Sequence, residues 1–146
     1  MARIDLDKTL TAPIDDVFAL LSDHAGYTRF RGFSSAELLR EGTDERNGVG
    51  ALRRLVVRPL RFEEEITAFE RPTRMDYVIR KVNLPLRHDG GTITLSSTPT
   101  GTRVLWRSTF TVPMPVVGRP LGAVLALGIR RGFVRLLEDI ERLAGP

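Results

Sequence analysis

The sequence contains no cysteine and only two histidines, His24 and His88. The lack of cysteine excludes disulfide bonds, thiolate metal sites and a cysteine nucleophile. The two histidines do not have the i, i+4 spacing of a helical zinc motif. No Gly-x-Ser-x-Gly motif, phosphate-binding glycine loop or carboxylate cluster of the metal or glycosidase type is present. We therefore expect no metal site and no cofactor, and hydrolase and nucleotide-dependent functions find no support.

The sequence also lacks a strong excess of charges of one sign and lacks long hydrophobic runs. Only two of the 22 basic residues are lysine (Lys8 and Lys81), and 18 acidic residues bring the net charge to +4. Because both signs are spread along the chain, we expect no specific nucleic-acid binding. The first residues lack the apolar segment of a secretory signal, and the longest nearly uncharged stretch, residues 112–129, is interrupted by Arg119 and three prolines. The sequence thus predicts a cytoplasmic protein without an integral membrane segment.

What is present is the composition of an ordinary folded domain. The length of 146 residues, with 42% hydrophobic and 27% charged residues, predicts a single domain over residues 1–146. Alternation of apolar and polar residues predicts strands, and apolar residues at helical spacing predict helices. The expected strands are residues 3–10, 35–40, 50–58, 60–69, 74–82, 92–97 and 102–112, and the expected helices are residues 13–21, 24–30 and 120–143.

The order of these elements predicts an α+β fold. Six strands follow the two short helices, and turn sequences such as Asn47-Gly48 and Asp89-Gly90-Gly91 favour an antiparallel meander. With the opening strand they form a seven-stranded curved sheet, whose apolar face must be covered by the long C-terminal helix. Because a strongly curved sheet cannot contact one helix along its whole length, we expect an apolar cavity between them.

Three segments carry a resemblance to a known family. They are residues 12–23 (APIDDVFALLSD) with Tyr27 and Phe30, residues 65–69 (EITAF) with Arg71-Pro72, and residues 101–106 (GTRVLW). In this order and spacing the chain resembles the START/Bet v 1-like (SRPBCC) superfamily, and within it the polyketide cyclase/dehydrase-type group. The resemblance covers essentially the whole chain and implies a helix-grip fold with a hydrophobic ligand cavity. It implies no catalytic residue, because a superfamily of aromatase/cyclases, lipid-transfer and hormone-binding proteins shares none.

The expected turn at residues 58–61 defines the pairing of two central strands. It places Arg54 near Glu65 and predicts an exposed ladder of ion pairs on one face of the sheet. On the other face Arg53 and Glu64 lie diagonally among apolar residues. One interpretation is edge exposure or a structural bridge. The other is that both groups project into the cavity and hydrogen-bond the polar group of a ligand.

Inward-facing strand positions and the apolar face of the C-terminal helix define the expected cavity. Its lining is predicted to be Leu55, Phe62, Ile66, Met75, Tyr77, Ile79, Trp106, Ser108, Phe110, Leu121, Leu125 and Phe133. Tyr77 and Trp106 combine a large ring with one polar group, which suits planar or amphiphilic ligands, and the alternative that they are plain core stays open. His88 lies beside an expected turn, either as a general base for enolisation or as a solvated loop residue. His24 is expected to be structural.

The stretch from Val116 to Ile129 is apolar nearly all round and contains several small residues. A simple surface helix would be amphipathic, so this stretch is expected to be buried on both sides. Three interpretations remain open: it lines the cavity and its mouth, it packs in a homodimer, or it makes transient contact with a membrane while lipid is loaded. Its glycines would also let the start of the helix fray and act as a gate.

Two functions follow from these patterns. The first is binding of a hydrophobic or aromatic small molecule, lipid-like or polyketide-like, in the cavity between sheet and helix. The alternative is an enzyme of the polyketide cyclase/aromatase type, in which Glu64, Arg53 or His88 moves protons during aldol cyclisation and dehydration. The sequence leaves open whether the protein is an enzyme and whether it is a monomer or a homodimer.

Overall fold

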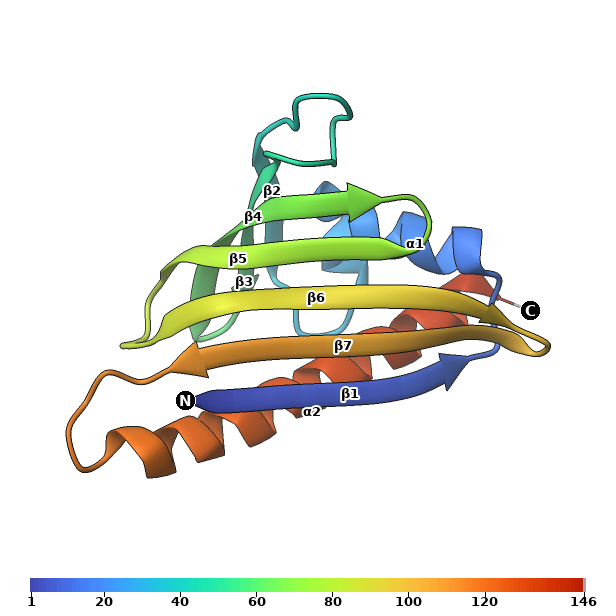
Figure 1. Ribbon diagram of the computed structural model, residues 1–146. Coiled ribbons are helices and arrows are strands. Elements are labelled where there is room, and N and C mark those ends of the chain that lie inside the picture. The colour runs from blue at the N-terminus through green and yellow to red at the C-terminus, as the bar shows by residue number, and fades with distance from the viewer. Residues whose placement is uncertain (146) are drawn as a thin grey trace.

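A seven-stranded antiparallel sheet curves around one long helix in the computed structural model, which describes residues 1–145 (Figure 1). The elements are β1 (Ala2–Leu10), α1 (Ile14–Ser22), the 3₁₀ helix η1 (His24–Arg29), β2 (Ser35–Arg40), β3 (Leu52–Val57), β4 (Leu60–Glu70), β5 (Arg74–Val82), β6 (Arg87–Thr98), β7 (Gly101–Thr111) and α2 (Gly118–Ala144). The strand order is β1-β7-β6-β5-β4-β3-β2, so each strand from β2 to β7 pairs with the next and β1 closes the sheet beside β7. The expected α+β helix-grip meander is confirmed.

Local sequence explains where the helices begin and end. Pro13 precedes α1, and Asp15 and Asp16 lie in its first turn, where carboxylates interact favourably with the helix dipole. The long helix α2 begins at Gly118, two residues before the expected start, and stops at Gly145, which adopts a positive φ of 70°.

The core divides into two clusters that pack against different halves of α2. In the larger one, Phe18 and Leu21 of α1 pack with Leu137 and Ile140 near the end of α2, and all four are at most 1% exposed. The smaller one surrounds Ile4, Phe110 and Val112, and the first half of α2 covers it. The sheet is therefore anchored firmly to the C-terminal half of α2 and more lightly to its first half.

The strand β6 begins earlier than the sequence pattern indicates. We expect a turn at Asp89-Gly90-Gly91, but these residues lie inside β6, which starts at Arg87. The register between β6 and β7 shifts between His88 and Gly90, and Gly90 has a φ of 137°, a conformation open to glycine. The glycine pair therefore builds a β-bulge and not a turn, which was the error in the prediction.

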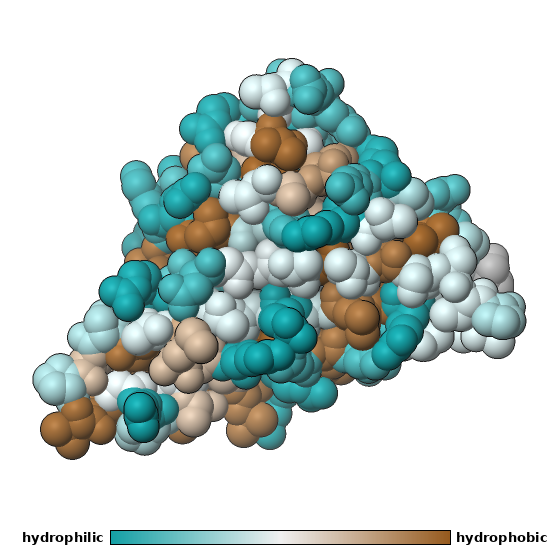
Figure 2. Space-filling view, viewed as in Figure 1, coloured by the Kyte–Doolittle hydropathy of each residue, from teal (hydrophilic) through white to brown (hydrophobic). Residues whose placement is uncertain are grey.

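The outer face of the sheet is polar and rich in ion pairs. Asp5 of β1 binds Arg107 of β7 at 2.9 Å, and Asp7 binds Arg103 at 2.6 Å. Viewed from this side, the surface is mostly hydrophilic with isolated hydrophobic residues, and hydrophobic atoms also appear at the corner where the loop before α2 lies (Figure 2). Because these pairs are exposed to water, they contribute little to stability, and their main effect is to distinguish the outer face from the apolar inner face.

The first half of α2 differs from the prediction. Instead of being buried on both sides, it leaves Val124 67% and Leu127 55% exposed, and Val116 in the preceding loop is 95% exposed. Its other side packs Leu121 and Leu125 against the smaller core cluster. Among residues 1–145, no helix combines the length and apolar character needed to cross a membrane.

Candidate ligand cavity

A cavity of about 240 Å³ lies between the inner face of the sheet and α2. Strands β3 to β7 form its walls, η1 and the loop after it close one side, and Gly128, Ile129, Gly132 and Phe133 of α2 close the other. The volume corresponds to roughly eight water molecules at about 30 Å³ each. The cavity thus has room for a molecule on the order of ten non-hydrogen atoms.

The residues expected to line the cavity fall into two groups. Those found in its lining are Leu55, Phe62, Tyr77, Ile79, Trp106, Ser108, Phe110 and Phe133. Ile66 and Met75 lie in the larger core cluster, fully buried, and Leu121 and Leu125 cover the smaller one. Ile66 and Met75 pack in the same cluster as Phe18 and Leu21 of α1 and are 0% exposed, so they fill the core and do not border the cavity.

Arg53 and Glu64 lie directly opposite each other on β3 and β4, and both contact the cavity. The expected register was wrong, since Arg54 pairs with Glu63 and not with Glu65. The guanidinium Nε and Nη2 of Arg53 both donate to Glu64 Oε1, at 2.9 and 2.6 Å. The two residues are 4% and 5% exposed, so the pair is a buried one and not exposed at an edge.

His24 extends this ion pair to a third residue. Its Nδ1 accepts from Arg53 Nη1 at 3.1 Å, while its Nε2–H donates to the carbonyl of Asn47 at 2.8 Å. Burial and then the positive charge of Arg53 lower the pKa of His24 to about 3. The imidazole is therefore neutral at pH 7, and it holds Arg53 in place from the side away from Glu64.

His88 lies inside β6 and is buried, so the interpretation as a solvated loop residue is wrong. The backbone N–H of Ile79 donates to its Nδ1 at 3.0 Å, and its Nε2 is 2.8 Å from Ser108 Oγ. Burial lowers the pKa of His88, so the ring is neutral. Its single proton must then be on Nε2 and is donated to Ser108. Neither nitrogen offers a free lone pair, and the pair cannot activate Ser108 as a nucleophile in this arrangement.

Tyr77 and Trp106 form the aromatic part of the cavity wall. Trp106 Nε1–H donates to the Tyr77 hydroxyl at 2.9 Å, and Trp106 stacks on Phe133 of α2 with ring centroids 3.8 Å apart. The Tyr77 ring lies across Gly91, where a Cβ atom would be 2.2 Å from Tyr77 Cζ. Burial, and then the negative charge of Glu64, raise the pKa of Tyr77, so its hydroxyl remains protonated.

Asp139 of α2 fixes the loop at the mouth of the cavity. Its carboxylate is fully buried and accepts two hydrogen bonds at 2.8 Å from Arg31, one from the backbone N–H and one from Nε. Burial alone would raise the pKa of Asp139, but the hydrogen bonds from Arg31 and Arg142 outweigh it and hold that pKa below its ordinary value. Arg31, Gly32 and Phe33, which all line the cavity, are thereby tied to the long helix.

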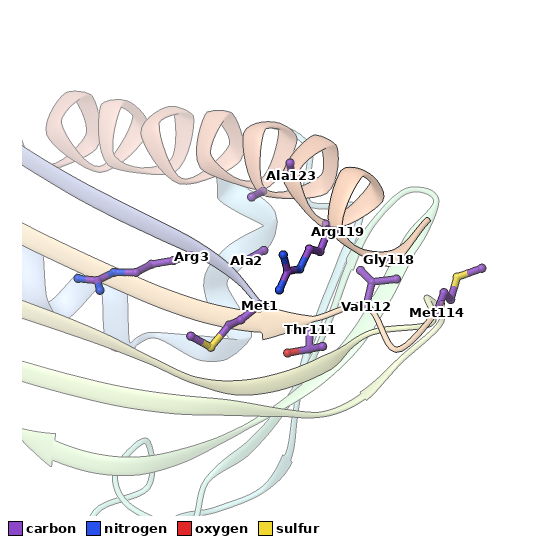
Figure 3. A pocket seen from close by; sticks show the side chains of 11 residues that line it. Met1, Ala2, Arg3, Thr111, Val112, Met114, Gly118, Arg119 and Ala123 are labelled. Carbon is purple, nitrogen blue, oxygen red and sulfur yellow. The ribbon is translucent and has the colours of Figure 1, made fainter. Parts of the chain in front are cut away.

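A second hollow of about 700 Å³ lies outside the sheet–helix cavity, between the start of β1, the end of β7 and the start of α2. Figure 3 shows Arg119 extending from α2 toward the ends of these two strands. The hollow is larger than the cavity, but Met1, Arg3, Met114 and Arg119 in its lining are exposed. We regard the smaller cavity as the candidate site because its polar groups are buried and held by defined partners.

The comparisons with known proteins agree with this geometry. The family model described as polyketide cyclase / dehydrase and lipid transport matches residues 1–145. The chain belongs to this family. A comparison with curated protein sequences finds no match. The family description names both catalysis and transport, so membership alone does not choose between them.

Solved structures show the same fold at low sequence identity. TTHA0849 from Thermus thermophilus is 19% identical with a TM-score of 0.76, and the match covers 97% of this chain and 96% of that protein. Ara h 8.0201 is 17% identical with a TM-score of 0.77, covering 97% and 96%. A START superfamily protein from Mycobacterium smegmatis is 12% identical with a TM-score of 0.77, covering 98% and 99%. The START/Bet v 1-like resemblance is confirmed at the level of fold.

Several cavity residues lie outside the set expected from the sequence. They are Ile4, Tyr27, Arg31, Gly32, Phe33, Val57, Leu60, Val82, Leu84, Leu86, Gly132, Arg135 and Leu136, whereas Gly128 and Ile129 belong to the stretch 116–129 for which lining of the cavity was one interpretation. The alternation of Leu84 and Leu86 leading to His88 was a usable signal, but the glycines after His88 hid it. Within residues 1–145, no three side chains of metal-binding type lie together.

Proposed function

We propose that the protein binds a small hydrophobic or aromatic molecule in the cavity between the sheet and α2. The observation that carries the proposal is the composition of the cavity. Its walls are formed mainly by aliphatic and aromatic side chains, and five polar residues in its lining, Arg53, Glu64, Tyr77, His88 and Ser108, are buried, while Arg31 and Arg135 are exposed. A largely apolar concave space with a small number of positioned polar groups is typical of small-molecule sites.

Trp106 offers a direct test, because it is the only tryptophan in the sequence and it lines the cavity. Titration with 2-naphthol, monitored by Trp106 fluorescence, is expected to saturate at one equivalent per chain. Ile79→Phe fills part of the cavity and should weaken this binding at least tenfold. Val78→Phe is the matched control, because strand alternation places Val78 on the outer face. No saturation with the parent protein, or equal affinities for the two variants, would contradict the proposal.

The cyclase alternative rests on Glu64. A carboxylate and the hydroxyl groups of Tyr77 and Ser108 share the cavity, and an aldol closure needs both a base at carbon and a donor to the carbonyl oxygen. If the protein is such an enzyme, Glu64→Gln abolishes turnover of a poly-β-keto substrate while the substrate still binds. Turnover by the parent protein at the rate of the uncatalysed reaction would leave binding as the function.

A further inference from the structure

Two hydroxyl groups in the cavity, those of Tyr77 and Ser108, can still donate a hydrogen bond. Ser108 Oγ accepts a hydrogen bond from His88 Nε2–H, because His88 Nδ1 is occupied by the backbone N–H of Ile79. The Tyr77 hydroxyl oxygen accepts from Trp106 Nε1–H. Each oxygen is thus fixed as an acceptor, and each still carries its own proton to donate.

The two hydroxyl groups lie beside the same residue. Tyr77 stacks on the His88 ring with centroids 5.5 Å apart, and Ser108 accepts from His88 Nε2–H. Within residues 1–145, neither hydroxyl donates to a backbone carbonyl or a carboxylate. Neither proton has an acceptor within those residues, and both side chains line the cavity. The cavity therefore presents hydrogen-bond donors from Tyr77 and Ser108.

Glu64 presents the matching acceptor. Both of its contacts with Arg53 go to Oε1, and no hydrogen bond from residues 1–145 reaches Oε2. In that part of the chain, every side-chain oxygen or nitrogen that is fully buried has a hydrogen-bond partner. Because Oε2 has none, it is not fully buried, and it is accessible from the cavity that Glu64 lines. Glu64 pairs with Ile79 of β5, whose backbone N–H donates to His88, and Tyr77 lies two residues before Ile79 on the same face of that strand, so the acceptor and the donors line the same part of the cavity.

We infer that the cavity selects small apolar molecules that carry a neutral hydroxyl group, a phenol or an enol, and discriminates against carboxylates. A hydroxyl oxygen accepts from the Tyr77–Ser108 pair while its proton is donated to Glu64 Oε2, so one ligand atom satisfies both groups. A carboxylate would bring a second negative charge next to Glu64, whose neutralising partner Arg53 is already bound to Oε1 and His24. This inference rests on the proposed function and specifies its ligand class.

Three probes of nearly equal size separate these contributions. 2-Naphthol donates and accepts, 2-methoxynaphthalene only accepts, and 2-naphthoate is an anion. From Trp106 fluorescence we expect 2-naphthol to bind about tenfold more tightly than 2-methoxynaphthalene and at least a hundredfold more tightly than 2-naphthoate. Equal binding of all three would overturn the inference and leave the proposed function intact. No saturable binding of any probe would overturn both.

Variants assign the effect to the named groups. Tyr77→Phe and Ser108→Ala should each weaken 2-naphthol binding severalfold, and the combined variant should weaken 2-naphthol and 2-methoxynaphthalene by the same factor, because both accept from these hydroxyl groups. Glu64→Gln should improve 2-naphthoate relative to 2-naphthol. The ratio of two probes on one variant cancels general loosening of the fold, so a variant of reduced stability remains informative. Affinities for 2-naphthol and 2-methoxynaphthalene that stay at the parent values in the Tyr77→Phe/Ser108→Ala protein would contradict the assignment of the donor.

Discussion

At the scale of single residues, the unusual feature is a buried charge network in a domain of modest size. Arg53, Glu64 and His24 are each at most 5% exposed. Removing charges from water is costly, and such a group is retained only when each member is paired. Arg53 also lies over the Tyr27 ring, 4.7 Å from its centroid. The network therefore depends on every member, and removal of one leaves another unpaired.

Replacing one member of the ion pair should be worse than replacing both. Arg53→Met leaves Glu64 buried without its partner and should lower the free energy of unfolding by about 3 to 5 kcal/mol. The double variant Arg53→Met/Glu64→Leu removes both charges and should recover much of this loss. Urea denaturation measures both values. If the double variant is less stable than Arg53→Met, the stability lost in the single variant does not come from leaving Glu64 unpaired, and the prediction is wrong.

His24 predicts how stability depends on pH. Its pKa is about 3 in the folded protein and about 6.5 when unfolded, so the unfolded chain binds the proton more readily. The contribution of His24 is complete above pH 6.5 and is lost as the pH falls toward 3, which amounts to about 2 kcal/mol between pH 7 and pH 5. Urea denaturation at these two pH values should show the loss in the parent protein and less of it in His24→Asn. NMR titration of the ring tests the same point directly: an imidazole that protonates near pH 6.5 would refute it.

At the scale of elements, α2 combines two halves with different roles. Its C-terminal half is anchored by Leu137, Asp139 and Ile140, which are fully buried. Gly128 in its first half and Gly132 just past its midpoint lie beside the cavity, and a Cβ atom at either position would meet nothing within 4 Å. Glycine inside a helix costs about 1 kcal/mol relative to alanine, so this half is held less firmly.

Stiffening this half should slow ligand entry. Gly128→Ala is expected to raise the free energy of unfolding by about 0.5 to 1 kcal/mol and to reduce the association rate of 2-naphthol in stopped-flow fluorescence. Gly122→Ala is the matched control, because it lies on the same helix but outside the cavity lining, with only ordinary contacts to Ala2 and Val112. It should stabilise the protein without changing the rate. Equal rates for all three proteins would rule out a gate in α2.

At the scale of the whole molecule, the pattern of hydrophobic residues was enough to predict the fold. Strand alternation and turn sequences located all seven strands, and the long apolar periodicity located α2. The inner face of the sheet follows from alternation alone, which is why Tyr77, Trp106 and Ser108 were expected in the cavity.

What the sequence did not predict depends on shifts of one or two residues. Because side chains alternate along a strand, an incorrect pairing between β3 and β4 made Arg53 and Glu64 diagonal neighbours when they are directly opposed. The bulge at Gly90 similarly concealed that His88 faces inward. Which inward residues line a space and which fill the core depends on the distance between sheet and helix, which no local pattern contains.

The central claim is that the cavity between sheet and α2 is the ligand site. The most direct measurement is the set of intermolecular NOEs between 2-naphthol and the protein in a saturated sample. We expect NOEs from the naphthyl protons to Trp106, Phe133 and Ile79, which line the cavity. NOEs restricted to Met1, Ala2 and Ala123 in the second hollow, or to the exposed Val124 and Leu127, would contradict it.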